Sequence, residues 1–222
     1  MIQLLMKNIS HTFCIFAFLV VALWLNYKCV KTPTNPGNLV FVSSQNSDFE
    51  KSIATVTKID DKSLNFTHVG IVNVTDTGVF VIEAVPEKGV IYSSFQEFLN
   101  ENKNAVIYTA SLKPEYQKHE RAAVKRACSH IGKAYDFAFD FENDLYYCSE
   151  LVYDAYSFAG GETDFFMKEP MTFKNKETDD TLPYWVEYFE KYKFTIPEGK
   201  PGVNPTGLSR SEKLMTLKTL KY

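Results

Sequence analysis

The chain contains the stretch Leu145-Tyr146-Tyr147-Cys148-Ser149-Glu150-Leu151-Val152, in which a cysteine opens an amphipathic helical pattern. The residues expected to face inward are Leu151, Val152, Ala155 and Phe158, and two glycines at 160–161 are expected to end the helix. A thiol at a helix N-terminus lies beside free backbone N–H groups and the positive end of the helix dipole, which favour the thiolate. Cys148 is therefore a candidate nucleophile, and the backbone N–H groups of Cys148 and Ser149 are candidate donors to an oxyanion.

A second stretch, Asn65-Phe66-Thr67-His68-Val69-Gly70-Ile71-Val72, places a histidine at the mouth of an apolar, β-branched strand. The sequence has four histidines. His11 lies in an apolar N-terminal segment, whereas His119 and His130 lie on the outer face and near the end of a charged helical segment. Only His68 opens a strand that is expected to be central. His68 is therefore the candidate base that takes the proton of Cys148.

A carboxylate interrupts the apolar run Phe80-Val81-Ile82-Glu83-Ala84-Val85. Because a lone buried charge is costly, Glu83 needs a partner. If the two strands pair about the turn at 75–78, residues 71–72 lie opposite residues 81–82 and Glu83 falls close to His68. There it would accept the second imidazole N–H and fix the tautomer of the ring. The alternative is an outward-facing glutamate on an edge strand, with Asn73 as a weaker candidate for the third role.

Composition narrows the class of protein. The net charge of the 222 residues is -3, and no basic stripe is present, so nucleic acid is not an expected partner. Of the four cysteines, Cys14 and Cys29 lie in or just after the apolar N-terminal segment, and Cys128 reads as a small buried hydrophobe. The spacing matches neither a zinc site nor a disulfide framework. This pattern favours a single reactive thiol.

The N-terminal residues differ from the rest of the chain. Residues 12–25 are apolar and uncharged, and Lys7 precedes them. This is the length of a signal-peptide core, shorter than a membrane span of about 20 residues. We expect residues 1–30 to be a signal peptide or a membrane anchor; lipid attachment at Cys29 and a buried helix of the domain are the alternatives. Residues 31–38, which contain two prolines and a glycine, are expected to be a linker to one domain at 39–222.

The remaining segments alternate between strand and helix patterns. Apolar β-branched runs predict strands at 39–43, 69–74, 79–85, 89–92 and 105–111, with the second and third forming a hairpin. Helical spacing predicts helices at 47–57, 94–99, 114–131 and 148–158, and the third of these is expected to bury Ala123, Val124, Ala127, Cys128 and Ile131. From Phe165 onward, five prolines predict a looser tail that wraps the domain. The fold class is therefore α+β, with a small, mainly antiparallel sheet packed with helices.

These motifs together resemble the YiiX/YaeF-like permuted papain-fold amidases, a branch of the NlpC-type cysteine peptidase superfamily. The matching stretches are Gly37-Asn38-Leu39-Val40-Phe41, Phe66-Thr67-His68-Val69-Gly70-Ile71-Val72, Val81-Ile82-Glu83-Ala84 with Gly89-Val90, and Tyr147-Cys148-Ser149-Glu150-Leu151-Val152-Tyr153. The tail around residues 201–205 and 208–211 is also similar. Asn38 stands where the family usually has aspartate, which puts in doubt any role of that aspartate near the site.

The resemblance implies a circularly permuted papain-like fold, in which the histidine hairpin precedes the cysteine helix. It implies a triad of Cys148, His68 and Glu83, no metal or organic cofactor, and a small peptide, amide or acyl substrate. Cell-wall peptides and N-acylated amino acids are the expected amides. An acyl-lipid or thioester hydrolase or acyltransferase on the same triad, and a non-catalytic cell-surface binding module, are the alternatives.

The sequence also predicts where the protein resides. An apolar leader followed by a linker predicts export to the cell envelope, periplasmic or outer surface, with attachment to the membrane. A glycan on the sequon Asn65-Phe66-Thr67 would obstruct the histidine segment, which favours a bacterial origin.

Overall fold

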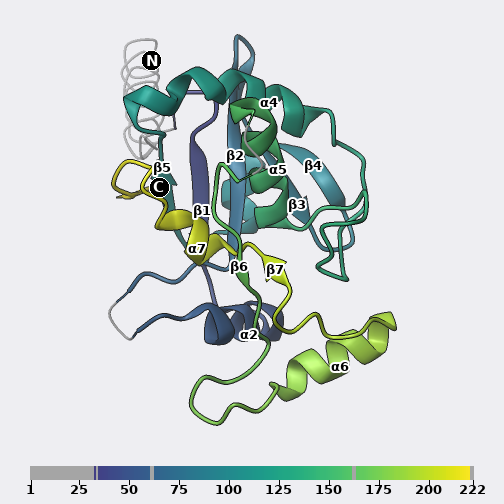
Figure 1. Cartoon of the computed structure of the whole chain (residues 1–222). Coiled ribbons are helices and arrows are strands. Elements are labelled where there is room, and N and C mark those ends of the chain that lie inside the picture. Colours follow the sequence, from purple (N-terminus) through teal and green to yellow (C-terminus); the bar gives the residue numbers. More distant parts are fainter. Residues whose placement is uncertain (1–32, 34, 61–62, 162–163, 221–222) are drawn as a thin grey trace, which may run out of the picture. The chain divides into compact units, whose positions relative to one another are not determined.

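The central element is a six-stranded antiparallel sheet (Figure 1). The computed structural model describes residues 33, 35–60, 63–161 and 164–220, so the predicted leader at 1–30 lies outside the described residues. Across the sheet the order is β4 (Gly89–Ser94), β3 (Gly78–Val85), β2 (His68–Thr75), β1 (Leu39–Ser43), β5 (Val106–Ala110) and β8 (Lys218–Thr219). The predicted α+β class with a mainly antiparallel sheet is confirmed.

The hairpin of β2 and β3 has the predicted register, with Ile71 opposite Ile82 and Val72 opposite Val81. The sequence specifies this register because a shift by one residue would turn the apolar side chains of one face to the other. Gly70 is required at its place in β2. A Cβ atom there would lie 2.6 Å from Val81 Cγ1 and 3.3 Å from the Ile82 carbonyl oxygen.

Gly70→Ala is therefore expected to destabilise the fold by about 1–3 kcal/mol, because the stiff Val81 side chain has no room to move. The free energy of unfolding from urea titrations measures this loss. Val81→Ala removes the clashing methyl group, so the double variant should be more stable than the sum of the two single changes allows. Additive effects would show that the contact with Val81 is not the cause.

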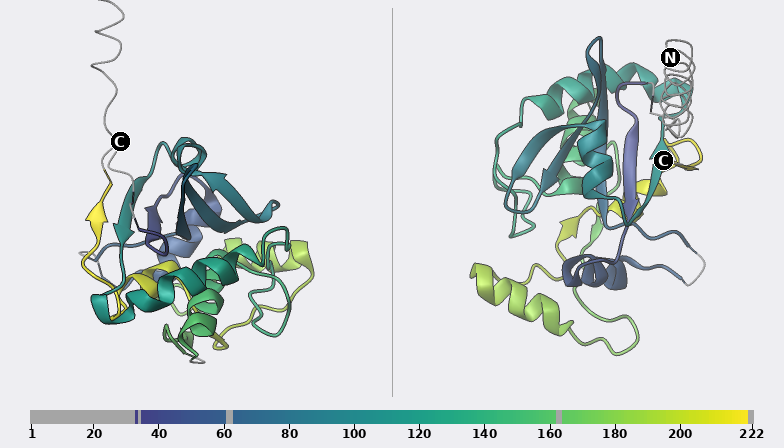
Figure 2. Two further views of the ribbon diagram at one scale, coloured as in Figure 1. Left: turned by 90° about the horizontal axis from the view of Figure 1, so that it is seen from above. Right: turned by 180° about the vertical axis from the view of Figure 1, so that it is seen from behind.

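Helices cover the sheet and continue beyond one end of it. They are α2 (Asp48–Thr57), α3 (Phe95–Glu101), the 3-10 helix η1 (Pro114–His119), α4 (Glu120–Cys128), α5 (Cys148–Gly160), α6 (Pro183–Tyr192) and α7 (Pro205–Ser209). Viewed from above, α4 and α5 form a layer on one face of the sheet (Figure 2). Residues 39–42 of β1 are fully buried, which shows that both faces of this strand are covered. The capping serines Ser47 and Ser94 begin α2 and α3 as their sequence patterns indicate.

The single helix predicted at 114–131 is wrong in both its type and its length. Residues Pro114–His119 form a 3-10 helix, and the α-helical part ends at Cys128. Beyond it the Gly132 N–H donates to the Val90 carbonyl and the Val90 N–H to the Lys133 carbonyl, which ties this turn to β4. Ile131, predicted to be buried, is consequently 45% exposed.

Phe158 is also placed differently from the prediction. It is 63% exposed and lies under the guanidinium of Arg126, whose carbon is 4.8 Å from the ring centroid. The buried aromatic residue of α5 is Tyr156, whose hydroxyl donates to the Gly37 carbonyl. Helical spacing alone did not distinguish these two positions, because α5 buries almost its whole circumference over its first turns.

The tail is more ordered than its prolines suggested. It contains α6 and α7, and a short pair of strands, β6 (Glu169–Pro170) and β7 (Pro201–Gly202). Trp185, Tyr188 and Phe189 of α6 are buried, and Phe49 of α2 stacks on Tyr188 with ring centroids 5.9 Å apart. This helix pair lies beyond the end of the sheet at which β2 begins (Figure 1). None of the helices in the described part of the chain is long and apolar enough to cross a membrane.

Candidate active site

His68 is the first residue of β2, and Glu83 of β3 lies beside it. Nε2 of His68 is 2.6 Å from Oε2 of Glu83, whose side chain is only 7% exposed. The hydroxyl of Ser93 donates to the other carboxylate oxygen at 3.2 Å. The buried carboxylate therefore has a partner on each oxygen, and it holds the imidazole in one orientation. Sequence analysis did not identify Ser93; its strand pairs with β3, and that pairing was the available signal.

The second nitrogen of His68 faces Cys148. Burial alone would lower the pKa of His68, but its hydrogen bonds to Cys148 and Glu83 and the charges of these groups raise that pKa to about 10. Because Glu83 occupies Nε2, Nδ1 is the atom that meets the thiol. A folded-state pKa above the unfolded value means that imidazolium stabilises the fold below about pH 6.5, and that this contribution is lost as the pH rises through about 10. The pair is suited to proton transfer at neutral pH.

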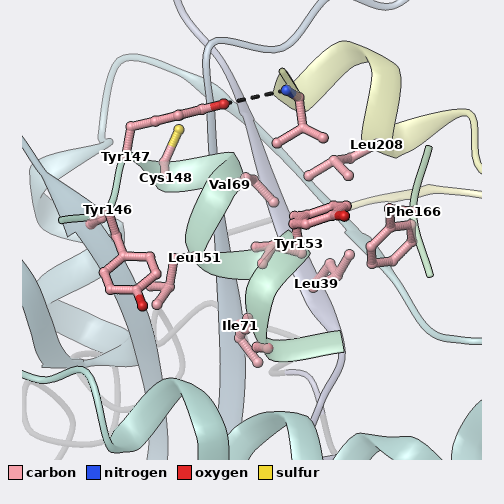
Figure 3. Packing of buried hydrophobic residues seen from close by; sticks show 14 of the residues in the cluster. Leu39, Val69, Ile71, Tyr146, Tyr147, Cys148, Leu151, Tyr153, Phe166 and Leu208 are labelled. Carbon is pink, nitrogen blue, oxygen red and sulfur yellow. Dashed lines mark hydrogen bonds between the residues drawn. The ribbon is translucent and has the colours of Figure 1, made fainter. Parts of the chain in front are cut away.

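Cys148 is the first residue of α5, and its neighbours are fixed by the tail of the chain (Figure 3). The first bond of the helix runs from the Leu151 N–H to the Tyr147 carbonyl, so the N–H groups of Cys148 and Ser149 lie ahead of the helical ladder. The Val203 N–H donates to the Tyr147 hydroxyl at 3.3 Å, and the Ser149 hydroxyl donates to the Val203 carbonyl at 3.0 Å. These bonds hold the helix start in place.

Two cavities adjoin the Cys148 and His68 side chains, one on each side. The first has a volume of about 330 Å³ and is lined by Cys148 and Ser149 but not by His68. The second, of about 460 Å³, is lined by His68, Glu83 and Ser93 but not by Cys148. Thr67 lines both. A substrate can therefore extend in two directions from a bond placed between the thiol and the imidazole.

A family model described as the permuted papain-like amidase enzyme, YaeF/YiiX, C92 family, matches residues 33–218. The chain belongs to this family. The uncharacterized protein YiiX of Escherichia coli K12 is 26% identical over 204 residues, which are 90% of this chain and 93% of that protein. Within the family, the histidine hairpin precedes the cysteine helix here as a circular permutation of papain requires, and the predicted fold is confirmed.

A crystal structure of YiiX from Escherichia coli O157:H7 has the same fold, with a TM-score of 0.64 at 24% identity over 85% of this chain and 98% of that one. That protein is described as a metalloprotein. In the described residues of the present amidase-family chain, no group of three or more His, Cys, Asp or Glu side chains is arranged to hold a metal ion. We therefore derive no step through a metal.

The other candidates of the same residue types are engaged elsewhere. Nδ1 of His119 is 2.9 Å from the Ala159 carbonyl oxygen, and Nε2 of His130 is 2.7 Å from Oδ2 of Asp154. Burial raises the pKa of the Cys128 thiol, which keeps it protonated. Asn73, the weaker candidate for the third role, donates instead to the Tyr92 hydroxyl at 2.9 Å. Only Cys148, His68 and Glu83 are brought together.

Asn38, which replaces the usual aspartate, lies away from this group. Its carbonyl accepts the Val72 N–H at 2.8 Å. Val72 is four residues along β2 from His68, a distance of about 13 Å at the rise of an extended strand. A direct effect of Asn38 on a substrate at Cys148 is therefore not expected. It lies at the end of the predicted linker, which pairs with the sheet from Gly37 onward.

Thr206 of α7 is a further contributor that sequence analysis missed. Its hydroxyl accepts the Phe66 N–H at 3.0 Å and donates to Asn65 Oδ1 at 2.8 Å. The Asn65 amide in turn donates to the Ala54 carbonyl at 2.6 Å. These contacts fix the two residues that lead into Thr67 and His68. The similarity of the tail to the family was the available signal, although it did not indicate this contact.

A buried carboxyl group lies in the first turn of α5. Burial, together with the charge of Asp136, raises the pKa of Glu150 to about 9, so this side chain is neutral at pH 7. The Tyr147 N–H donates to its Oε2 at 3.3 Å. Asp136 is fully buried and accepts the N–H groups of Ala138 and Asp140. Glu150 therefore caps the helix without placing a second negative charge next to the Cys148 thiolate.

Glu150→Gln is expected to flatten the pH dependence of stability. A carboxyl whose folded pKa is raised stabilises the fold below its unfolded pKa, and this contribution is lost as the pH rises through about 9. Relative to wild type, the variant should therefore gain on the order of 2 kcal/mol between pH 5 and pH 9. Urea titrations across this range measure the difference. Glu142→Gln, at an exposed position of the same loop, is the control, and parallel curves for Glu150→Gln and wild type would contradict a neutral Glu150.

Proposed function

We propose that this member of the amidase family is a cysteine amidase in which Cys148 is the nucleophile, His68 transfers the proton and Glu83 orients His68. The observation that carries the proposal is the position of His68, bound to Glu83 through Nε2 at 2.6 Å and facing Cys148 with its other nitrogen. Membership in a family of papain-like amidases supports the reaction class. We propose amide bonds of small peptides, including cell-wall peptides, or of N-acylated amino acids as substrates.

In this proposal the thiolate of Cys148 attacks the amide carbonyl, and the N–H groups of Cys148 and Ser149 stabilise the oxyanion. The C–N bond breaks as the imidazolium of His68 gives its proton to the leaving amine. Neutral His68 then takes a proton from water, and the hydroxide displaces the thiolate from the thioester. The carboxylic acid leaves, and the imidazolium and thiolate are restored.

Trapping the acyl-enzyme tests the reaction class. Wild-type protein is mixed with short N-acyl amides and thioesters, quenched in acid and weighed intact by mass spectrometry. We expect a mass increase equal to one acyl group on Cys148 and none on Cys148→Ala. A protein that forms neither adduct nor product with any of these substrates is instead a binding module on the same scaffold, and the amidase proposal fails.

We also propose that the protein is exported to the bacterial cell envelope and held at the membrane by its N-terminal segment. The uncharged residues 12–25 and the proline-containing segment at 31–38 support this. Fractionation of cells that express the full chain should place it in the membrane or envelope, and mass spectrometry of its N-terminus should show an anchor, a new terminus or a lipid on Cys29. Unprocessed full-length protein in the soluble cytosol would contradict the proposal.

A further inference from the structure

The 330 Å³ cavity beside Cys148 has a direction relative to the reaction, and this inference rests on the proposed function. The acyl carbon bonds to the sulfur of Cys148, whereas the leaving amine must accept the proton of His68. The cavity lined by Cys148 and Ser149 but not by His68 is therefore on the acyl side. The cavity lined by His68 and Glu83 is on the side of the leaving amine.

The walls of the acyl-side cavity are mostly apolar. They come from four separate parts of the chain and include Ile53, Val56, Phe139, Met171, Phe173 and Trp185. At about 30 Å³ for a methylene-sized unit, 330 Å³ holds roughly ten carbons. This is more than one aliphatic peptide side chain needs. A cavity of this kind excludes water well, which favours a long apolar group.

The polar groups of this wall are already engaged within the protein. Arg210 NH2 is 3.5 Å from Glu169 Oε1, and the Asn204 side chain accepts the Gly207 N–H at 2.8 Å. The Thr57 hydroxyl donates to a carbonyl of its own helix at 2.8 Å. A peptide backbone on this side would bury N–H and C=O groups with few partners, which is costly. A hydrocarbon chain has no such requirement.

The amine-side cavity has the opposite character. Its lining includes the polar and charged side chains of Ser47, Glu50, Lys88, Ser93 and Glu101. A hydrated, polar leaving group fits these walls. We propose that the substrate is an N-acylated polar amine whose medium-length aliphatic acyl chain occupies the apolar cavity beside Cys148.

The chain-length dependence of acylation tests this proposal. p-Nitrophenyl acetate, octanoate and decanoate acylate a reactive thiol and release a coloured product, with Cys148→Ala supplying the background rate. Each buried methylene favours binding about fourfold. We expect the second-order rate constant to rise at least tenfold from the acetyl to the octanoyl ester. Equal rate constants for all three esters would overturn the acyl-chain proposal and leave the cysteine chemistry intact.

A variant that fills the cavity supplies the second arm. Ile53→Trp should lower the ratio of the decanoyl to the acetyl rate constant at least tenfold, because the indole occupies the space of the chain. Ile131→Trp, on the 45% exposed turn after α4, should leave that ratio unchanged. An unchanged ratio in a folded Ile53→Trp protein would contradict the assignment of the cavity.

Binding to the protein without its nucleophile separates this proposal from the proposed reaction. Calorimetric titration of Cys148→Ala with decanoate and with acetate should show binding of decanoate only. If no ester acylates wild type but decanoate binds, the amidase proposal fails and the acyl-chain cavity stands. If the esters acylate Cys148 but decanoate binds no better than acetate, the acyl-chain cavity is overturned and the amidase proposal stands.

Discussion

Cys148→Ala is expected to reduce amide hydrolysis by a factor on the order of 10⁴ or more, to the background rate. The thiol is the only atom in the proposed mechanism that bonds to the substrate, and no neighbouring group replaces it. The fold should survive, since the change removes one sulfur atom from a residue that is 7% exposed, at a cost of about 1 kcal/mol. Initial rates and a thermal melt of the same preparation measure the two effects.

Cys128→Ala is the matched control for this variant. Cys128 is the other free cysteine in the described part of the chain, and burial raises its pKa. Its loss should change neither hydrolysis nor labelling by iodoacetamide. Labelling that disappears with Cys128 and persists without Cys148 would move the nucleophile to Cys128.

Glu83→Gln is expected to lower kcat/KM roughly 100-fold and to move its alkaline limb to lower pH. The carboxylate contributes to the raised pKa of His68, about 10 in wild type, so removing its charge lowers that pKa and the imidazolium is lost at a lower pH. The amide is nearly isosteric with the carboxylate, so binding of the substrate should change much less than turnover. Rate profiles from pH 5 to pH 11 measure both effects.

Glu97→Gln is a suitable comparison, because this glutamate lies on the rim of the same cavity and caps α3. Its profile should keep the wild-type alkaline limb. A Glu83→Gln protein with the wild-type limb and rate would show that another group orients His68.

The features that could be predicted from the sequence depend on local patterns. The register of the β2–β3 hairpin follows from alternating side chains and a short turn, and this register by itself predicts that Glu83 lies near His68. The position of Cys148 followed from the start of a helical pattern. Each inference needs only residues that are close together in the chain, apart from the pairing of the thiol with the histidine strand.

The features that were missed depend on contacts between distant segments. Ser93 bonds to Glu83 because β4 lies beside β3, and Thr206 supports Phe66 across 140 residues of sequence. The acyl-side cavity is lined by α2, α6 and two parts of the tail, none of which suggests a cavity by itself. Phe158 was misplaced because helical spacing indicates a face of the helix but not where the neighbouring helix ends.

The most direct test of the central claim is the rate of alkylation of Cys148 by iodoacetamide as a function of pH, in wild type and in His68→Ala. Because the pKa of His68 is raised to about 10, the imidazolium remains beside the sulfur throughout the neutral range, and wild type should already react rapidly at pH 6. In His68→Ala the rate should rise with pH as for a free thiol, with a midpoint near about 8.5. If the two proteins gave the same curve with that midpoint, Cys148 and His68 would not form a catalytic pair.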